Sequence, residues 1–323
     1  MERAENSSEK IIPEALESDK EITGDAGKEL YEKASKYLKD VFESVRLEKT
    51  ISLNPGIQII NDMIALQSSK DMLFLRTFQD DDLDEFVVTH PVNVAIYAIR
   101  MAEHLGWRKD RQVDLGMAAL LHDVGMASIP DELLFKEGRL SDAECRIIKE
   151  RSNYAYNILK TFKDDYAYLA ECALHVNERL DGSGYPMGLK GDEISEIAQI
   201  IGLVDVYEAL IHSRPQREKL PHFTAIKEII KLGKNIFQKQ YLKTLLNIFS
   251  RFPIFSYVRF NSNAIGRVIE TYPGQPVSPK VQIVFDSENR RLLTERIINL
   301  QENPQFTIVD SVSEEELNGL FEK

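Results

Sequence analysis

The sequence predicts a mainly α-helical protein with an N-terminal helical segment and a small C-terminal β unit. Apolar residues recur at helical spacing from about residue 25 to 249, without interspersed strand patterns. Beyond Pro253, short β-branched runs such as VQIVF and RIINL alternate with turn-forming stretches. A chain of 323 residues exceeds one small core, so we expect separate units. We predict a flexible acidic leader (1–24), an N-terminal helical segment (25–80), a helical domain (81–250) and a β unit with a C-terminal tail (251–323).

Composition favours a soluble cytoplasmic protein. Hydrophobic residues make up 43% of the chain and charged residues 28%, which is ordinary for a globular domain. No stretch approaches the roughly 20 apolar residues of a membrane span, and MERAENSSEK lacks the pattern of a signal peptide. A net charge of -12 argues against a nucleic-acid polymer as partner, although a local basic pocket remains compatible with a small anion.

The N-terminal segment predicts two helices. One carries the periodic apolar residues from Leu30 to Val45, and the next begins at Asn54-Pro55, because proline suits a first helical turn. The pair packs on its own domain or forms a coiled dimer arm. We favour the first alternative, because no heptad pattern persists for the roughly three to four repeats of a coiled coil.

The long helical block includes a capping-box pattern, in which Ser141 precedes Glu144 by three residues. We expect the following helix to turn five residues inward: Ile147, Ile148, Ala155, Ile158 and Leu159. The C-terminal runs predict four or five strands, arranged as a barrel or a meander.

His122 and Asp123 are the first candidate for chemistry, because they follow the apolar run AALL at the end of a predicted buried helix. Burying both without partners costs several kcal/mol, so a hydrogen-bonded core pair and a metal site both explain them. His90 and Asp205 also stand on helical faces and favour the metal site. This donor set suits one divalent ion, Mn, Fe or Zn.

Two strings carry a family resemblance: HDVGMASIPDELLFKEGRLSDAE and NERLDGSGYPMGLKGDEISEIAQIIGLVDVYEALIHSRP. They resemble the HD-GYP family of bacterial phosphodiesterases from about Asp81 to Phe249, within an HD-type multi-helix domain. The resemblance implies a metal cluster and hydrolysis of the second messenger cyclic di-GMP. The family's first His, HD pair and later Asp fall on His90, His122, Asp123 and Asp205, and Asp123 is the catalytic candidate if the protein is active.

The family's second metal lacks matching ligands in this sequence. Arg151, Val176 and Asn177 stand where the family has histidines, Met126 replaces its lysine, and Phe86 occupies a position for a third-metal glutamate. A guanidinium cannot coordinate a cation, but it attracts phosphate. We therefore expect no second metal. His175 could replace the missing ligand only through a local irregularity, because two residues turn a helix by about 200 degrees.

The motif that follows is largely kept. The resemblance assigns a ligand- and partner-facing turn to Glu178, Asp181, Gly182, Gly184, Tyr185 and Pro186. It also assigns phosphate contacts to Arg214 and Arg217, so Arg151, Tyr185, Arg214 and Arg217 form the expected ligand-binding set. A diguanylate cyclase or another signalling protein is the partner that the turn implies.

Three hypotheses follow. The first is a degenerate HD-GYP protein that binds cyclic di-GMP, a partner protein or both, with weak or absent hydrolysis. The second is an active metal-dependent phosphodiesterase with an atypical one- or two-metal site. The third is a structural adaptor that docks through the turn. His104, His212 and His222 lie outside the motif, and we expect them at the surface or at helix ends.

Overall fold

The computed structural model describes residues 24–67, 72–77, 86–249, 252, 256–272, 275, 277–292, 294, 296–312 and 314–321. The predicted acidic leader therefore lies outside the described residues except for Gly24. The acidic run that contains Glu85 lies outside them as well.

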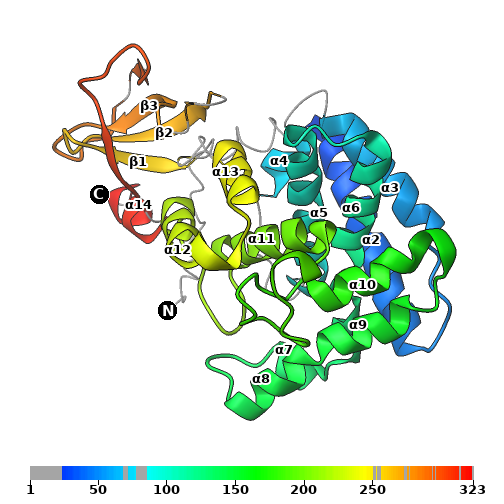
Figure 1. Cartoon of the computed structure of the whole chain (residues 1–323). Coiled ribbons are helices and arrows are strands. Elements are labelled where there is room, and N and C mark those ends of the chain that lie inside the picture. The colour runs from blue at the N-terminus through cyan, green and yellow to red at the C-terminus, as the bar shows by residue number, and fades with distance from the viewer. Residues whose placement is uncertain are drawn as a thin grey trace, which may run out of the picture.

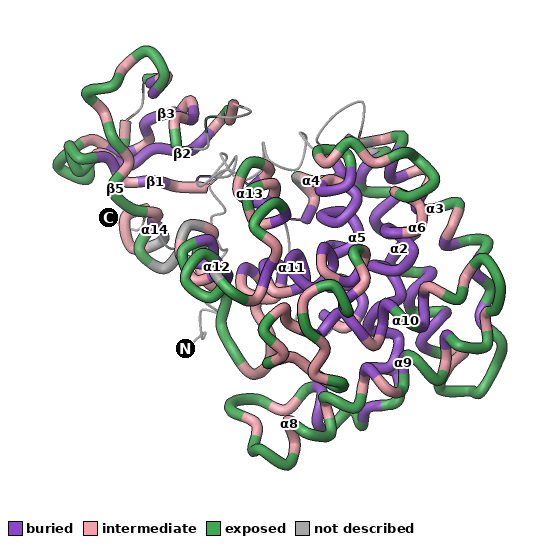
Figure 2. Tube along the Cα trace, viewed as in Figure 1, coloured by how far each residue is buried: buried purple, intermediate pink, exposed green. Residues whose placement is uncertain are grey.

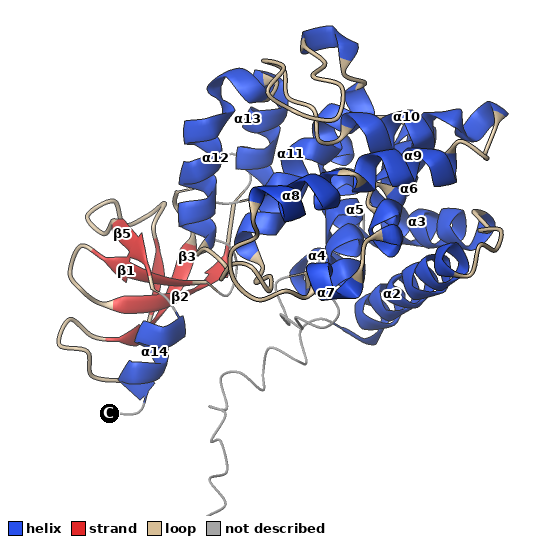
Figure 3. Cartoon of the chain, turned by 90° about the horizontal axis from the view of Figure 1, so that it is seen from below, coloured by secondary structure: helices blue, strands red, loops and turns tan. Residues whose placement is uncertain are grey.

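The described chain forms a helical body followed by a small sheet, with the sheet beside α12 in Figures 1 and 3. The helices are α2 (Gly24–Arg46), α3 (Asn54–Gln67), α4 (Met72–Arg76), α5 (Phe86–His104), α6 (Lys109–Leu121), η1 (Val124–Ser128), α7 (Asp131–Leu134), α8 (Asp142–Lys149), α9 (Arg151–Leu159), η2 (Asp164–Tyr166), α10 (Ala167–His175), η3 (Gly191–Glu193), α11 (Glu196–Ile211), α12 (His222–Ile236), α13 (Lys239–Ile248) and α14 (Glu314–Phe321).

The core of the helical body lies around α5, α6 and α11, which are largely buried in Figure 2. The N-terminal helices α2 and α3 share this core, because Leu38 and Ile60 are fully buried within it. The prediction that this pair packs on its own domain is therefore confirmed. An ion pair between Arg46 and Asp131, 2.6 Å apart, adds a surface contact between α2 and α7.

Five residues between Ser141 and Leu159 were expected to face inward, and this is wrong for Ile147. The capping box at Ser141 is present, but α8 ends at Lys149 and α9 begins at Arg151. Because of this break, α8 has no buried residue and Ile147 is 45% exposed, although Ala155 and Leu159 on α9 are buried as expected.

The β unit is an open antiparallel sheet of five strands, so the barrel alternative is wrong. Its order is β4-β3-β2-β1-β5, in which β1 to β4 form a meander and β5 joins at β1. Alternate residues of β1 and β3 are buried on one face, as the period of a strand requires. The strands are β1 (Tyr257–Phe260), β2 (Ile265–Glu270), β3 (Lys280–Phe285), β4 (Ile297–Asn299) and β5 (Ile308–Ser311).

A close helix contact brings α9 to the HD pair. A Cβ atom added at Gly125 would lie 2.0 Å from the Arg151 carbonyl oxygen and 2.6 Å from the Ala155 nitrogen. Only glycine therefore allows η1 to touch the backbone of α9 here. This contact sets the first residue of α9, Arg151, beside Asp123.

We expect Gly125→Ala to lower the free energy of unfolding by about 1–3 kcal/mol, because the added methyl group meets backbone atoms that cannot rotate away. Urea unfolding followed by circular dichroism measures this loss. Gly319→Ala is the matched control, because a Cβ at Gly319 has no heavy atom within 4 Å. Equal stability of the two variants would contradict the packing argument.

Candidate metal and ligand site

Three helices bring His90, His122 and Asp205 together inside the helical body. One ligand atom from each lies within 4.8 Å of the others, and all three residues are buried. The His90 Nε2 atom lies 2.8 Å from Asp205 Oδ1, and His122 Nε2 lies 3.8 Å from the same oxygen. His122 Nδ1 donates to the Ala119 carbonyl oxygen at 2.7 Å, so Nε2 is the ring nitrogen that lies beside the carboxylates of Asp123 and Asp205.

Asp123 completes this group and also contacts Arg151. Its Oδ2 lies 3.8 Å from His90 Nε2 and 3.6 Å from His122 Nε2. Its Oδ1 lies 3.1 Å from Arg151 Nε, although the contact lacks the angle of a hydrogen bond. Burial alone would raise the pKa of Asp123, but the positive charges of Arg151, His122 and His90 outweigh it and hold the pKa below its usual value.

These donors fit one divalent ion. Metal bonds of about 2.0–2.2 Å place neighbouring ligand atoms roughly 3 to 3.6 Å apart. The distances between the donor atoms given above, 2.8 to 3.8 Å, span this range. Within the described chain, His122 Nε2 is buried and has no hydrogen-bond partner. A buried polar atom is costly without a partner, and a metal ion would supply one.

Glu208 belongs to the same site and was missed by the sequence analysis. Its carboxylate accepts the Nδ1–H of His90 and, at 2.9 Å, an amide N–H of Asn93. Burial would raise the pKa of Glu208, but His90 and His212 keep it well below its usual value. The available signal was its spacing, because residues 205 and 208 lie on one face of a helix.

The positions of the family's second metal are occupied by other contacts. Arg151 Nη2 donates to Asn177 Oδ1 at 3.0 Å, and Asn177 Nδ2 donates to Ser152 Oγ at 3.1 Å. Burial opposes the charge of Arg151, but Asp123, Tyr185 and Asp205 raise its pKa, so the guanidinium stays protonated. Arg151 and Asn177 are therefore bonded to other protein groups in the structure.

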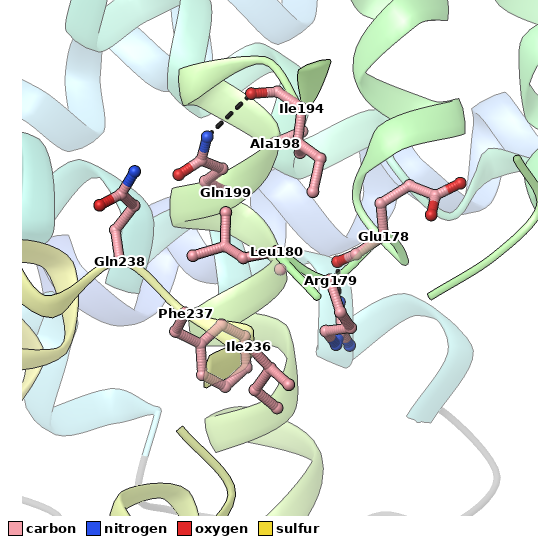
Figure 4. A pocket seen from close by; sticks show the side chains of 10 residues that line it. Glu178, Arg179, Leu180, Ile194, Ala198, Gln199, Ile236, Phe237 and Gln238 are labelled. Atoms are coloured by element: carbon pink, nitrogen blue, oxygen red, sulfur yellow. Dashed lines mark hydrogen bonds between the residues drawn. The ribbon is translucent and has the colours of Figure 1, made fainter. Parts of the chain in front are cut away.

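Glu178 holds the GYP turn and does not face the cluster. Its carboxylate accepts backbone N–H groups of Met187, Gly188 and Leu189 at 2.6, 3.0 and 3.0 Å. A small pocket borders this segment, lined by Arg179, Leu180 and Phe237 among others, and Figure 4 shows the Glu178 carboxylate turned away from it. Glu178 thus ties the end of α10 to the turn.

The turn itself packs directly on this segment. A Cβ at Gly184 would lie 2.3 Å from Glu178 Cα, so only glycine fits there. Gly182 has a φ of +82°, and Asp181 Oδ1 accepts the backbone N–H of Ser183 at 2.9 Å. Tyr185 precedes Pro186 and donates its backbone N–H to the Asn177 carbonyl oxygen, while Lys149 lies 5.0 Å from its ring centroid.

The two predicted phosphate-binding arginines differ in their surroundings. Arg214 Nη2 lies 3.3 and 3.4 Å from the ring nitrogens of His90 and 3.8 Å from Glu208, at the edge of the cluster. The Arg217 guanidinium donates to the carbonyl oxygens of Ala209 and Leu210 near the end of α11. The structure therefore brings Arg214, but not the Arg217 guanidinium, into contact with the cluster.

The remaining histidines lie outside the cluster of donors. His175 is buried at the end of α10 and accepts the backbone N–H of Ser195 at 3.3 Å. His104 is the last residue of α5, His212 follows α11, and His222 begins α12. His212 reaches the site indirectly, through Glu208.

Comparison with known proteins identifies both parts of the chain. Residues 62–239 match the HD domain, and residues 257–320 match a KOW domain associated with the HD domain. The open sheet described above is the second of these regions. The predicted HD-type helical fold and the resemblance to HD-GYP proteins are confirmed.

The curated relatives include cyclic di-GMP phosphodiesterases of Pseudomonas aeruginosa and Borreliella burgdorferi. They are 25% and 26% identical, over 80% and 77% of this chain and 63% and 65% of their own lengths. The chain thus spans less than two thirds of these relatives. An HDG"Y"P protein from Bdellovibrio bacteriovorus shares the fold, with a TM-score of 0.60, 19% identity and coverage of 72% of this chain and 77% of its own.

Membrane insertion was not expected from the sequence. Among the described helices, none combines the length and apolar character needed to cross a bilayer.

The surroundings of His212 predict a pH-dependent stability. Burial opposes protonation, but the charge of Glu208 and hydrogen bonds to Glu208 and Thr77 raise the pKa of His212 to about 9. The contribution of His212 to the free energy of unfolding is therefore complete below 6.5, the pKa of the residue in the unfolded chain. It is lost as pH rises through about 9, the pKa in the folded protein. We expect His212→Gln to reduce the fall in unfolding free energy across this range by about 1–3 kcal/mol.

Urea unfolding of the metal-free protein at several pH values measures this change. His104→Gln is the control, because His104 is exposed and bonds only within its own helix turn in the contacts described, to the Arg100 carbonyl oxygen. An unchanged pH profile in His212→Gln would refute the assignment.

Proposed function

Since the chain belongs to the HD domain family, we propose that it binds a cyclic dinucleotide of the cyclic di-GMP type at a one-metal pocket and hydrolyses it slowly or not at all. The observation that carries this proposal is the buried contact of Arg151 with Asp123. The contact supports the proposal, because Arg151 aligns with a second-metal ligand of the resembled family and carries a positive charge that disfavours a second cation. The two named relatives support the ligand class, because both are cyclic di-GMP phosphodiesterases.

The proposed metal ligands are His90, His122, Asp123 and Asp205. A divalent ion bound there supplies positive charge for a phosphate oxygen and lowers the pKa of coordinated water. The protein's own residues orient the ligands: the Ala119 carbonyl fixes the ring of His122, and Glu208 fixes the ring of His90. We do not assign ligands to a second ion, because Arg151, Asn177 and Glu178 are committed to the contacts described above.

The proposed phosphate contacts come from Arg151, which contacts Asp123, and from Arg214, which contacts His90 and Glu208. Arginine binds phosphate oxygens through paired N–H groups, and Arg214 is 23% exposed, so a ligand can reach it. Arg217 could join only by leaving the carbonyl oxygens at the end of α11, and its role stays a prediction. Tyr185 interacts electrostatically with Arg151 and Asp123, and its contact with the ligand and docking of a signalling protein on its turn stay predictions.

An active phosphodiesterase is the second candidate. The four proposed ligands of the first metal are together and buried, which favours it. Hydrolysis of cyclic di-GMP with Mn or Fe decides between the two. Rapid turnover that vanishes in His122→Ala and Asp123→Ala would establish the enzyme and overturn the binding proposal.

Removal of Arg214 tests the ligand site. We expect Arg214→Ala to weaken binding of cyclic di-GMP about 10- to 150-fold, because a charged hydrogen bond to phosphate contributes about 1.5–3 kcal/mol. Isothermal titration calorimetry measures the affinity. Arg108→Ala is the control, because Arg108 is exposed and pairs with Asp110 at the start of α6. Absence of binding by the unaltered protein would remove the nucleotide from the proposal.

Restoring the missing imidazoles tests the metal count. We expect the triple variant Arg151→His, Val176→His, Asn177→His to hold two metal ions per chain where the unaltered protein holds one, and to hydrolyse cyclic di-GMP faster. Removing the guanidinium abolishes the repulsion of a second cation, and the new imidazoles can coordinate it. Metal analysis of protein purified with Mn measures both. Two ions in the unaltered protein would contradict the proposal.

A further inference from the structure

We propose that Tyr31 of the N-terminal helix α2 is a positioning residue for His90, acting through Asn93 and Glu208. The inference rests on the proposed one-metal pocket, because it assigns the control of one of its ligands. Tyr31 and His90 lie on different helices, α2 and α5, and Glu208 lies on a third, α11. A contact of the N-terminal segment is thereby linked to the centre of the site.

The link is a continuous set of hydrogen bonds. The Tyr31 hydroxyl donates to Asn93 Oδ1 at 2.8 Å, and Asn93 Nδ2 donates to Glu208 Oε1 at 2.9 Å. The other carboxylate oxygen of Glu208, Oε2, accepts the Nδ1–H of His90. The four residues are 7, 3, 2 and 6% exposed in this order, so water does not compete freely for these bonds.

Each bond fixes the orientation of the next group. The Asn93 amide cannot reverse, because its oxygen would then face the carboxylate of Glu208. With Oε1 held by Asn93, Oε2 stays in the position that receives His90 Nδ1–H. His90 then presents Nε2, not Nδ1, toward Asp205 and Asp123. Outer partners of this kind set the tautomer and direction of a metal-binding histidine.

Charge compensation does not depend on Tyr31. His212 lies 3.1 Å from Glu208 Oε1, and Arg214 lies 3.8 Å from Oε2, so the carboxylate keeps its cationic neighbours without the hydroxyl. Removing the hydroxyl therefore leaves the Asn93 amide, and through it the Glu208 carboxylate, less firmly oriented. The charges around Glu208 stay in place. The substitution Tyr31→Phe keeps the aromatic ring, whose centroid lies 4.9 Å from the Arg76 guanidinium.

Tyr31→Phe in the full chain is the test, with Mn²⁺ as the probe. We expect the affinity for Mn²⁺, measured by calorimetry, to fall about 3- to 10-fold, less than the 10- to 100-fold typical of a direct outer partner. Tyr37→Phe is the matched control, because Tyr37 is also buried on α2 and its hydroxyl donates to the Ser52 carbonyl oxygen at 3.0 Å. It loses an equivalent hydrogen bond that has no link to His90, so its affinity should not change.

A second measurement separates this inference from the one-metal proposal. In the metal-free protein, we expect the ¹⁵N NMR signals of the His90 ring to shift in Tyr31→Phe and to stay in place in Tyr37→Phe. Unchanged signals, or an unchanged Mn²⁺ affinity in Tyr31→Phe, would overturn the inference. Failure of the unaltered protein to bind Mn²⁺ overturns the one-metal proposal and the metal role of Tyr31 together, whereas the NMR comparison still decides whether Tyr31 orients His90.

Discussion

Burial of three carboxylates is the constraint on which the site depends. Asp123, Asp205 and Glu208 are 4, 7 and 2% exposed. A buried charge without compensation is strongly destabilising, so each carboxylate requires a cationic neighbour. The carboxylate of Asp123 pairs with Arg151, and that of Asp205 pairs with His90. The carboxylate of Glu208 pairs with both His90 and His212. These pairs bring together His90 on α5, Arg151 on α9, and Asp205 and Glu208 on α11.

Close backbone contacts make this arrangement possible. Gly125 lets η1 touch α9, and Gly184 lets the GYP turn rest on the end of α10. In the first place the neighbouring side chain, Arg151, contacts Asp123, and in the second, Glu178 binds backbone N–H groups that follow the turn. The glycines thus determine which polar groups reach the pocket, although they make no polar contact with it themselves.

Much of the fold was predictable from local patterns. The apolar periodicity predicted α2 and α3, Ser141 and Glu144 predicted the start of α8, and the β-branched runs predicted the C-terminal strands. Tertiary packing decided what these patterns could not. Ile147 fits an inward helical face, but the break at Glu150 turns α8 away from the core. The choice between a barrel and an open sheet depended on strand pairing, which short runs do not encode.

For the site, motif positions predicted which residues lie near the cluster but not how they are oriented. His90, His122, Asp123 and Asp205 were named in advance, and Glu208 was missed because the sequence does not show that its carboxylate is bonded to His90. Conversely, Arg217 and Glu178 were expected in the site, but their side chains make other contacts. Both were named from the motif, yet their side chains bond to backbone groups near α11 and in the turn.

The contact between Arg151 and Asp123 also bears on the charge balance of the buried site before an ion binds. In a site whose negative charge is balanced only by metal ions, the carboxylates repel one another until an ion binds. Here a covalently attached cation is delivered with the polypeptide, so part of the neutralisation is present from synthesis onward. Part of the charge balance inside the helical body is thus independent of any bound ion.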